Sequence, residues 1–234
     1  MSPDNPSNLA VLPEPAALLF DLDGTLVDTL RVRLEACSRT FERVGILVDR
    51  DRLAGYLGSD GRWLAGEIGR AAGRELDYAA TDDLDRVAGS IFDELNTSPT
   101  PLPGATELLT ALEESHLSFA IATSSQRGQV AASVAALRLP SPPPITDGGD
   151  VAHAKPAPDL LLASAAQLGI PPERCWYVGD STWDMLAAVR ARMVAIGVTT
   201  GAVNAEGLLA AGASVAIDSL AAMLEHLRGR GLLC

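Results

Sequence analysis

Short apolar runs recur along the chain and alternate with segments of helical pattern. In the segments between the runs, apolar residues return every three or four positions, as at Val130, Val134 and Leu137. A weaker strand-like stretch surrounds Ile145. The clear runs are residues 16–20, 117–122, 175–178, 193–198 and 214–217. Strands that are apolar on both faces and alternate with helices are typical of a parallel sheet covered on both sides. The pattern predicts an α/β fold with a doubly wound, Rossmann-like parallel sheet.

The alternation breaks in residues 28–98, where the pattern is helical throughout. Apolar residues step by three or four from Leu30 to Val44 and again from Leu84 to Leu95. Two shorter helix-like stretches lie between them: Asp49–Leu57 and Arg62–Ala72. We therefore expect an all-α domain, here named the helical lobe, inserted into a discontinuous core. The expected boundaries are 28–98 for the lobe and 1–27 with 99–234 for the core, with residues 97–101 as the returning linker.

Composition limits the classes of partner. The 234 residues include 18 basic and 30 acidic side chains, a net charge of −12. Nucleic acids and anionic membranes repel such a chain, so neither is expected as a partner. No uncharged apolar run approaches the roughly 18 residues of a membrane helix, and no basic segment precedes the first apolar stretch. We expect a soluble, cytoplasmic protein, either a monomer or a homodimer.

The candidates for chemistry are polar residues that follow the predicted strands, because ligands of a parallel sheet bind at the carboxyl ends of its strands. Each of them alone also has an ordinary explanation, such as a turn or a helix cap, so only the set is informative. The set comprises Asp21, Asp23, Thr123, Lys155, Asp180 and Asp184.

Four carboxylates at one edge repel one another. Two like charges 4 Å apart cost roughly 4 kcal/mol at an effective dielectric constant of 20. A divalent cation would remove this repulsion, and a site of oxygen ligands without His or Cys favours Mg²⁺. The cation and Lys155 could then hold a phosphate, with a hydroxyl donor from Thr123. One carboxylate could attack phosphorus while its neighbour transfers a proton.

Four segments resemble, in order, the four motifs of the haloacid dehalogenase-like (HAD) hydrolase superfamily. They are Asp21–Thr29, Ile121–Ser125, Lys155–Asp159 and Gly179–Asp184. The resemblance extends from Leu18 to about Ala222 and is strongest to the subgroup of phosphoglycolate phosphatases and β-phosphoglucomutases, whose helical cap is inserted after the first motif. It implies that the helical lobe is such a cap.

The resemblance also implies a reaction. It is the Mg²⁺-dependent hydrolysis of a small phosphomonoester through an aspartyl-phosphate on Asp21, with Asp23 as general acid/base. Lys155 would also steady the nucleophile. The implied phosphate-binding residues are Leu22, Asp23, Thr123, Ser124 and Lys155. The implied metal ligands are Asp21, the backbone carbonyl of Asp23, Asp180 and Asp184, the last of which would support the water shell or Lys155.

Several alternatives are weighed against this interpretation. Haloacid dehalogenases resemble the chain but lack the second acid, Asp23, and phosphonoacetaldehyde hydrolases use a cap lysine, which residues 28–98 do not contain. Sugar-phosphate mutases such as β-phosphoglucomutase carry a His where this chain has Arg33, which favours a phosphatase. The alternative from another class is a non-catalytic phosphate-binding or signalling module resembling a receiver domain.

Substrate specificity is expected to come from the helical lobe. The segment Gly58–Trp63 lies where relatives keep a specificity loop, and Arg62 could pair with a carboxylate or second phosphate of a substrate. Alternatively, Trp63 belongs to the core of the lobe and Arg62 faces solvent. The candidates for specificity are Arg33, Arg62 and Trp63. Trp183 could pack on the lobe or shape the pocket mouth, and His153 could reach the site.

Closure of the lobe would exclude bulk water from the site. Hinges are expected near Val27–Thr29 and Ser98–Pro103, where the chain crosses between core and lobe.

Overall fold

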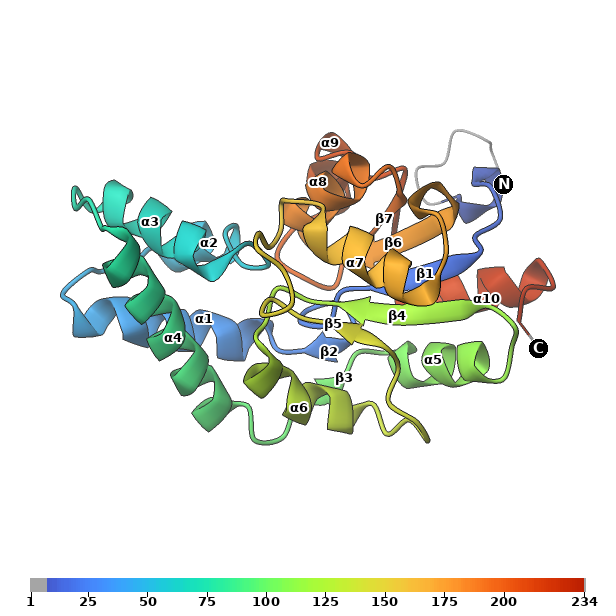
Figure 1. Cartoon of the computed structure of the whole chain (residues 1–234), viewed down its shortest axis with the longest axis horizontal. Coiled ribbons are helices and arrows are strands. Elements are labelled where there is room, and N and C mark those ends of the chain that lie inside the picture. Colours follow the sequence, from blue (N-terminus) through green and yellow to red (C-terminus); the bar gives the residue numbers. More distant parts are fainter. Residues whose placement is uncertain (1–7, 234) are drawn as a thin grey trace.

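A six-stranded parallel sheet forms the centre of the computed structural model, which describes residues 8–233. Its strand order is β5-β4-β1-β6-β7-β8. The strands β4 and β5 are added on one side of β1, and the later strands β6, β7 and β8 are added on its other side. The strands are β1 (Ala17–Phe20), β4 (Ser118–Ala122), β5 (Ile145–Thr146), β6 (Cys175–Gly179), β7 (Val194–Val198) and β8 (Val215–Ile217). The predicted doubly wound α/β fold is confirmed (Figure 1).

Helices cover both faces of this sheet (Figure 1). One face carries α5 (Ala105–Glu113), α6 (Arg127–Ala136) and α10 (Leu220–Gly229), and the other carries α7 (Asp159–Leu168), α8 (Thr182–Arg190) and α9 (Ala205–Ala210). Alternate residues of β1 serve the two sides: Leu18 and Phe20 pack into the first core, and Leu19 packs into the second. A strand buried on both faces must be apolar at every position, which explains the unbroken run in the sequence.

The helical lobe stands beyond the carboxyl ends of the strands (Figure 1). It contains α1 (Leu30–Arg43), α2 (Arg50–Ala54), α3 (Gly61–Ala71) and α4 (Tyr78–Leu95). The side chains of Asp49, Asp60 and Asp77 cap α2, α3 and α4 by accepting hydrogen bonds from backbone N–H groups of the first turn. The lobe has an apolar cluster of its own, which includes Phe41, Leu53 and Ile68.

The two crossings between core and lobe run side by side. The strands β2 (Val27–Asp28) and β3 (Thr100–Pro101) form a two-stranded antiparallel sheet. Next to it, the backbone N–H of Leu102 donates to the carbonyl of Leu26 at 2.9 Å. Part of the expected linker 97–101 is therefore a strand. The lobe is tethered to the core by this one narrow ribbon.

The remaining elements are two short 3₁₀ helices, η1 (Leu9–Val11) and η2 (Pro172–Arg174). Among the described residues, no helix combines the length and the apolar character needed to cross a lipid bilayer.

Candidate active site

The strand register brings the predicted site residues to one edge. Phe20 of β1 is aligned with Ile121 of β4 and with Val178 of β6, so the residues that follow these strands end together. An open cavity of about 960 Å³, its solvent-facing mouth included, lies between this edge and the helical lobe. Its walls on the core side include Asp21, Asp23, Thr123, Ser124, Lys155 and Asp180.

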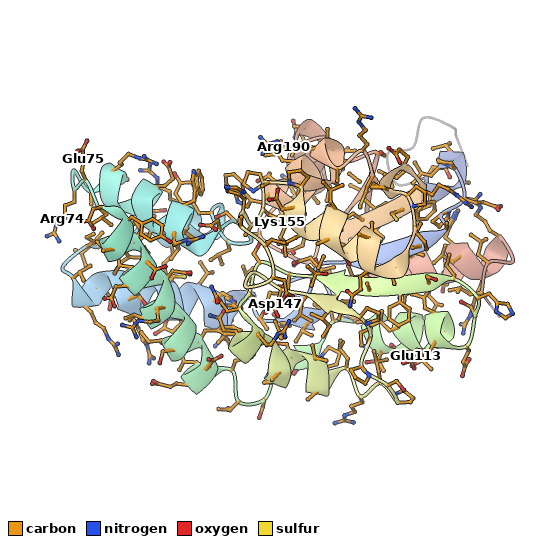
Figure 2. All side chains as sticks on the ribbon, viewed as in Figure 1. Arg74, Glu75, Glu113, Asp147, Lys155 and Arg190 are labelled. Atoms are coloured by element: carbon orange, nitrogen blue, oxygen red, sulfur yellow. The ribbon has the colours of Figure 1, made fainter. Side chains whose placement is uncertain are left out.

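The buried ammonium of Lys155 is the centre of this edge. Lys155, the one lysine in the sequence, has no exposed surface. Its Nζ donates to Oδ1 of Asp21 at 2.6 Å and to Oδ1 of Asp184 at 2.7 Å. Burial opposes the charge of Lys155, but the two carboxylates outweigh burial and raise its pKa, so the side chain stays protonated. Figure 2 shows Lys155 where the helical lobe meets the sheet.

Asp184 serves as the partner of Lys155 and does not line the cavity. Its Oδ1 also accepts a hydrogen bond from the Tyr177 hydroxyl at 3.0 Å. Its Oδ2 accepts from the backbone N–H of Ser181 at 3.0 Å and from the hydroxyl of the same residue at 2.5 Å, which completes a capping box at the start of α8. Both oxygens are thus occupied by the protein itself.

Asp21, Asp180 and Asp184 form a group that could hold a metal ion, with one oxygen of each within 4.8 Å of the others. Burial raises the pKa of Asp21, which Lys155 opposes and Asp184 reinforces, and burial together with Asp184 and Asp21 raises the pKa of Asp180. Within the described part of the chain, Oδ2 of Asp21 and Oδ2 of Asp180 have no hydrogen-bond partner. Asp21 and Asp180 therefore each contribute an oxygen without a hydrogen-bond partner to this buried acidic group.

Two glycines fit closely around Asp180. Gly24 has a φ of 86°, and a Cβ added there would lie 2.6 Å from Oδ2 of Asp180. A Cβ added at Gly201 would overlap the same oxygen. Thr25 Oγ1 donates to Oδ1 of Asp180 at 2.9 Å, which sets the rotation of the carboxylate. The sequence pattern included Gly24 and gave no indication of Gly201, which lies on a loop after β7.

Asp23 points away from the acidic group and toward the helical lobe. Arg33 of α1 places Nη2 2.9 Å from Oδ2 of Asp23. Ser125 Oγ donates to the same oxygen at 2.5 Å, and Thr29 Oγ1 donates to Oδ1 at 2.8 Å. Burial raises the pKa of Asp23, but the charge of Arg33 and these hydrogen bonds outweigh burial and hold the pKa below its ordinary value. The two acids of the first motif thus have opposite environments.

Arg33 is itself held in place from both sides of the cavity. Its Nη1 donates to Oε1 of Gln129 at 2.9 Å, and its Nη2 donates to Oγ of Ser125 at 2.5 Å, both on the core. The guanidinium lies 3.4 Å from the centre of the Phe92 ring of α4, a cation–π contact within the lobe. The sequence had marked Arg33 as a departure from the His of the mutases and as a candidate for substrate specificity, but its pairing with Asp23 was not foreseen.

Two other predicted residues of the helical lobe do not line the cavity. Arg62 donates to the Tyr78 hydroxyl at 2.8 Å and lies 3.6 Å from Asp60, on the lobe surface. The Trp63 ring packs against Tyr56 and against Trp183, with ring centres 5.6 and 4.7 Å apart. The first turn of α3 aims both side chains away from the cavity, so this geometry gives neither of them access to a ligand.

The other residues singled out in the sequence have these positions. Leu22 is fully buried and does not line the cavity, so only its backbone is near the site. Thr123 is buried at the cavity wall, and its Oγ1 accepts from the N–H of Ser125 at 3.1 Å. His153 is exposed, lies 3.2 Å from Asp159, and is not part of the cavity lining.

Besides the hydrogen bonds of Arg33, three hydrogen bonds join the loop 55–60 of the lobe to the core near the cavity. The backbone N–H of Asp60 donates to the carbonyl of Lys155 at 2.9 Å. Ser124 Oγ donates to the carbonyl of Gly58 at 3.2 Å, and Trp183 Nε1 donates to the carbonyl of Gly55 at 3.0 Å. The loop 55–60 therefore rests on the residues of the predicted motifs, and its contacts are few and polar.

Comparison with known proteins agrees with this architecture. The family model of haloacid dehalogenase-like hydrolases matches residues 18–198, and the chain belongs to this family. The resemblance drawn from the four motifs is thereby confirmed.

Relatives and solved structures are similar over most of the chain. The probable phosphatase IndB of Dickeya dadantii is 31% identical over 211 residues, which cover 86% of this chain and 89% of that protein. The chloroplastic protein SUPPRESSOR OF QUENCHING 1 of Arabidopsis thaliana is 30% identical over 190 residues, covering 79% of this chain and only 18% of that much longer protein. A crystal structure of a hydrolase from Pseudomonas syringae has a TM-score of 0.86 at 30% identity and covers 91% of this chain and 98% of its own. Other relatives are named phosphoglycolate phosphatase, hexitol phosphatase and β-phosphoglucomutase.

The contact between Arg33 and Asp23 makes a measurable prediction. Replacing Arg33 with Gln removes the positive charge, so the pKa of Asp23 should rise by about one unit or more, since one unit corresponds to about 1.4 kcal/mol of interaction. Carbon-13 NMR titration of the Asp23 carboxyl measures this. Because the pKa of Asp23 is lowered in the folded protein, its share of stability is present above the unfolded pKa and is lost as the pH falls.

Arg62→Gln is the matched control, since Arg62 is also an arginine of the lobe but contacts only lobe residues. It should leave the titration of Asp23 unchanged. An Asp23 pKa that is the same in Arg33→Gln and in the parent would contradict the electrostatic role assigned to Arg33.

Proposed function

We propose that the chain is a Mg²⁺-dependent phosphatase that hydrolyses phosphomonoesters of small soluble metabolites, with Asp21 as the nucleophile. The observation that carries the proposal is the state of Asp21. One of its oxygens is held by the buried Lys155 at 2.6 Å, and the other is free and faces the cavity edge beside Asp180. A carboxylate fixed by one oxygen and free at the other is positioned for attack.

Mg²⁺ fits the donor set. The group consists of carboxylate oxygens alone, which suits a hard cation. The glycines beside Asp180 leave room for its carboxylate, and the hydrogen bond from Thr25 orients it. Asp21, Asp180 and the backbone carbonyl of Asp23 would hold the ion, and Asp184, whose oxygens are engaged, would act through Lys155 or a water molecule. Bound there, the ion supplies positive charge for the phosphate oxygens and reduces the repulsion between the carboxylates.

The reaction then consists of two displacements at phosphorus. Oδ2 of Asp21 forms a bond to phosphorus, and the bond to the ester oxygen breaks while Asp23 supplies a proton to the departing alkoxide. A water molecule next attacks the aspartyl-phosphate, gives a proton to Asp23, and releases inorganic phosphate and the carboxylate of Asp21. Lys155 and the hydroxyl of Thr123 would hold the phosphoryl oxygens throughout.

The contact with Arg33 divides these two steps between two arrangements of the lobe. With Arg33 in contact, Asp23 is ionised, which suits acceptance of a proton from water. Donation of a proton to the leaving group requires that Arg33 release Asp23. Arg33 belongs to α1, so a movement of the lobe about its narrow ribbon would do this. Such a movement would break the hydrogen bonds of Arg33 and would also act on those of the loop 55–60 and on the bond from Asn96 to Ser133.

A mutase and a non-catalytic phosphate-binding module remain the alternatives. A mutase must bind a second phosphate, and Arg33, the cation that the lobe presents to the cavity, is already paired with Asp23. A binding module would have no use for Asp23 as a second acid. Both points favour the phosphatase.

Replacing the nucleophile provides the direct test of this function. With Mg²⁺ and p-nitrophenyl phosphate, the parent should release phosphate, and Asp21→Asn should lower kcat by about 10³-fold or more because an amide does not attack phosphorus. Asp218→Asn removes the same charge at an exposed position of the core that does not line the cavity, and it should retain full activity. Absence of turnover in the parent would favour the binding module, and undiminished turnover in Asp21→Asn would exclude the proposed nucleophile.

The role of the glycine beside Asp180 leads to a prediction about metal binding. Gly201→Ala adds a methyl group that overlaps Oδ2 of Asp180, so Mg²⁺ affinity should fall by roughly tenfold or more although every ligand is kept. Affinity should also fall as the pH is lowered, because burial raises the pKa values of Asp21 and Asp180 and protons then compete with the ion. Isothermal titration calorimetry measures both effects.

Gly128→Ala is the control for this substitution, since a Cβ at Gly128 would meet nothing within 4 Å. Its Mg²⁺ affinity should equal that of the parent. Equal affinity in Gly201→Ala and Gly128→Ala would show that the ion does not use Asp180.

A further inference from the structure

The part of the cavity that a leaving group would occupy is formed by the helical lobe. On the lobe side the walls are mostly small or apolar, and they include Leu30, Ala36, Ala54, Leu57, Leu64 and Ala88. A phosphoryl group beside Asp21 would direct the organic part of its ester toward these residues. Their character therefore bears on which esters can bind.

Only two charged side chains of the lobe line this cavity, Arg33 and Asp85. The guanidinium of Arg33 is taken up by Asp23, Ser125 and Gln129 of the core, and it stacks on Phe92. In this arrangement of the lobe, Arg33 is therefore not available to a second anionic group of a ligand. A carboxylate or a second phosphate in this place would instead face the charge of Asp85.

Asp85 of α4 has no partner of its own within the described part of the chain. It is half-buried, and no hydrogen bond or ion pair reaches its carboxylate. It lies so close to the start of α3 that a Cβ at Gly61 would overlap it, yet no backbone N–H of α3 donates to it. Burial, reinforced by Asp60 and opposed by the charges of Arg33 and Arg62, raises the pKa of Asp85 to about 6, so the group is mainly ionised at neutral pH.

A half-buried carboxylate without a protein donor keeps its acceptor capacity for a ligand, and a donor that reaches it in this largely apolar wall makes a charge-assisted hydrogen bond. The carboxylate of Asp85 lies near the first turn of α3, where the helix dipole stabilises a negative charge but does not neutralise it. Asp85 thus presents an unpaired carboxylate to the part of the cavity reserved for the organic half of an ester.

We propose that Asp85 is a specificity-determining residue that binds a hydrogen-bond donor, an ammonium or a hydroxyl group, on the leaving group of the substrate. This rests on the proposed phosphatase function. The substrates are then phosphomonoesters with an amino or hydroxyl group on a largely apolar body and without a second anionic group. Esters that carry a carboxylate or a second phosphate are poor substrates.

Matched series of alkyl phosphates test this in the parent protein. Within each chain length, the far end of the alkyl group carries an amine, a hydroxyl, a methyl or a carboxylate group. At the best chain length, the amino and hydroxy esters should exceed the carboxylate ester in kcat/KM by about tenfold or more, a difference of about 1.4 kcal/mol. The difference should lie mainly in KM, since Asp85 does not touch the reacting atoms.

Asp85→Asn keeps the size of the side chain and removes its charge. The ratio of kcat/KM between amino and carboxylate esters should fall to within about threefold of unity, less than 1 kcal/mol. Glu94→Gln, which removes a charge from the exposed side of the same helix and does not line the cavity, should keep the parental ratio. An equal loss in both variants would show a general effect of net charge and overturn the role of Asp85.

The parent alone decides the matter if the variant fails to fold. Turnover of p-nitrophenyl phosphate and of methyl-ended esters, with no preference for amino or hydroxy over carboxylate esters, would refute the inference and leave the phosphatase standing. No turnover of any ester would instead refute the proposed function on which the inference rests.

Discussion

A fully buried ammonium between two carboxylates is the constraint around which the site is organised. Lys155 can remain charged at zero exposure only because Asp21 and Asp184 both lie within 2.7 Å of its Nζ. Asp184 is in turn fixed by Tyr177 and by the capping box of α8. The position of Asp21 therefore depends on β1, β6, α8 and the loop of Lys155 together, and loss of any partner would leave a charge buried without compensation.

This network leaves one oxygen of Asp21 free, and the second acid is kept out of it. Asp23 turns to the helical lobe, where Arg33, Ser125 and Thr29 surround it. Two carboxylates separated by one residue thus meet different surroundings, one shared with a lysine and an acidic group and the other paired with a movable arginine. Such a difference is what allows one acid to attack and the other to exchange a proton.

Much of this arrangement could be predicted from the sequence, because it depends on local pattern and on strand ends. Runs that are apolar on both faces identified the parallel sheet, and polar residues at the ends of parallel strands must share an edge, as Asp21, Thr123 and Asp180 do. The contact of Arg33 with Asp23 could not be predicted, since it depends on the position and orientation of α1 relative to the core.

The helical lobe shows more clearly which contacts cannot be predicted from the sequence. The sequence left two places open for Arg62 and Trp63, either at the cavity or on the surface and in the core of the lobe. In the structure, Arg62 lies on the lobe surface and Trp63 packs against Trp183. The cavity is lined by Asp85 of α4, which belongs to none of the four sequence motifs. The orientation of a helix is set by its packing against other helices, and it cannot be predicted from the spacing of residues along that helix alone.

The central claim is that a carboxylate of the protein, and not water, first attacks phosphorus. The stereochemical course of hydrolysis of a phosphorothioate monoester, made chiral at phosphorus with 16O and 18O and hydrolysed in 17O-labelled water, tests it most directly. Two successive in-line displacements, first by Asp21 and then by water, predict overall retention of configuration in the inorganic thiophosphate that is released. Inversion would mean a single displacement by water and would contradict the account.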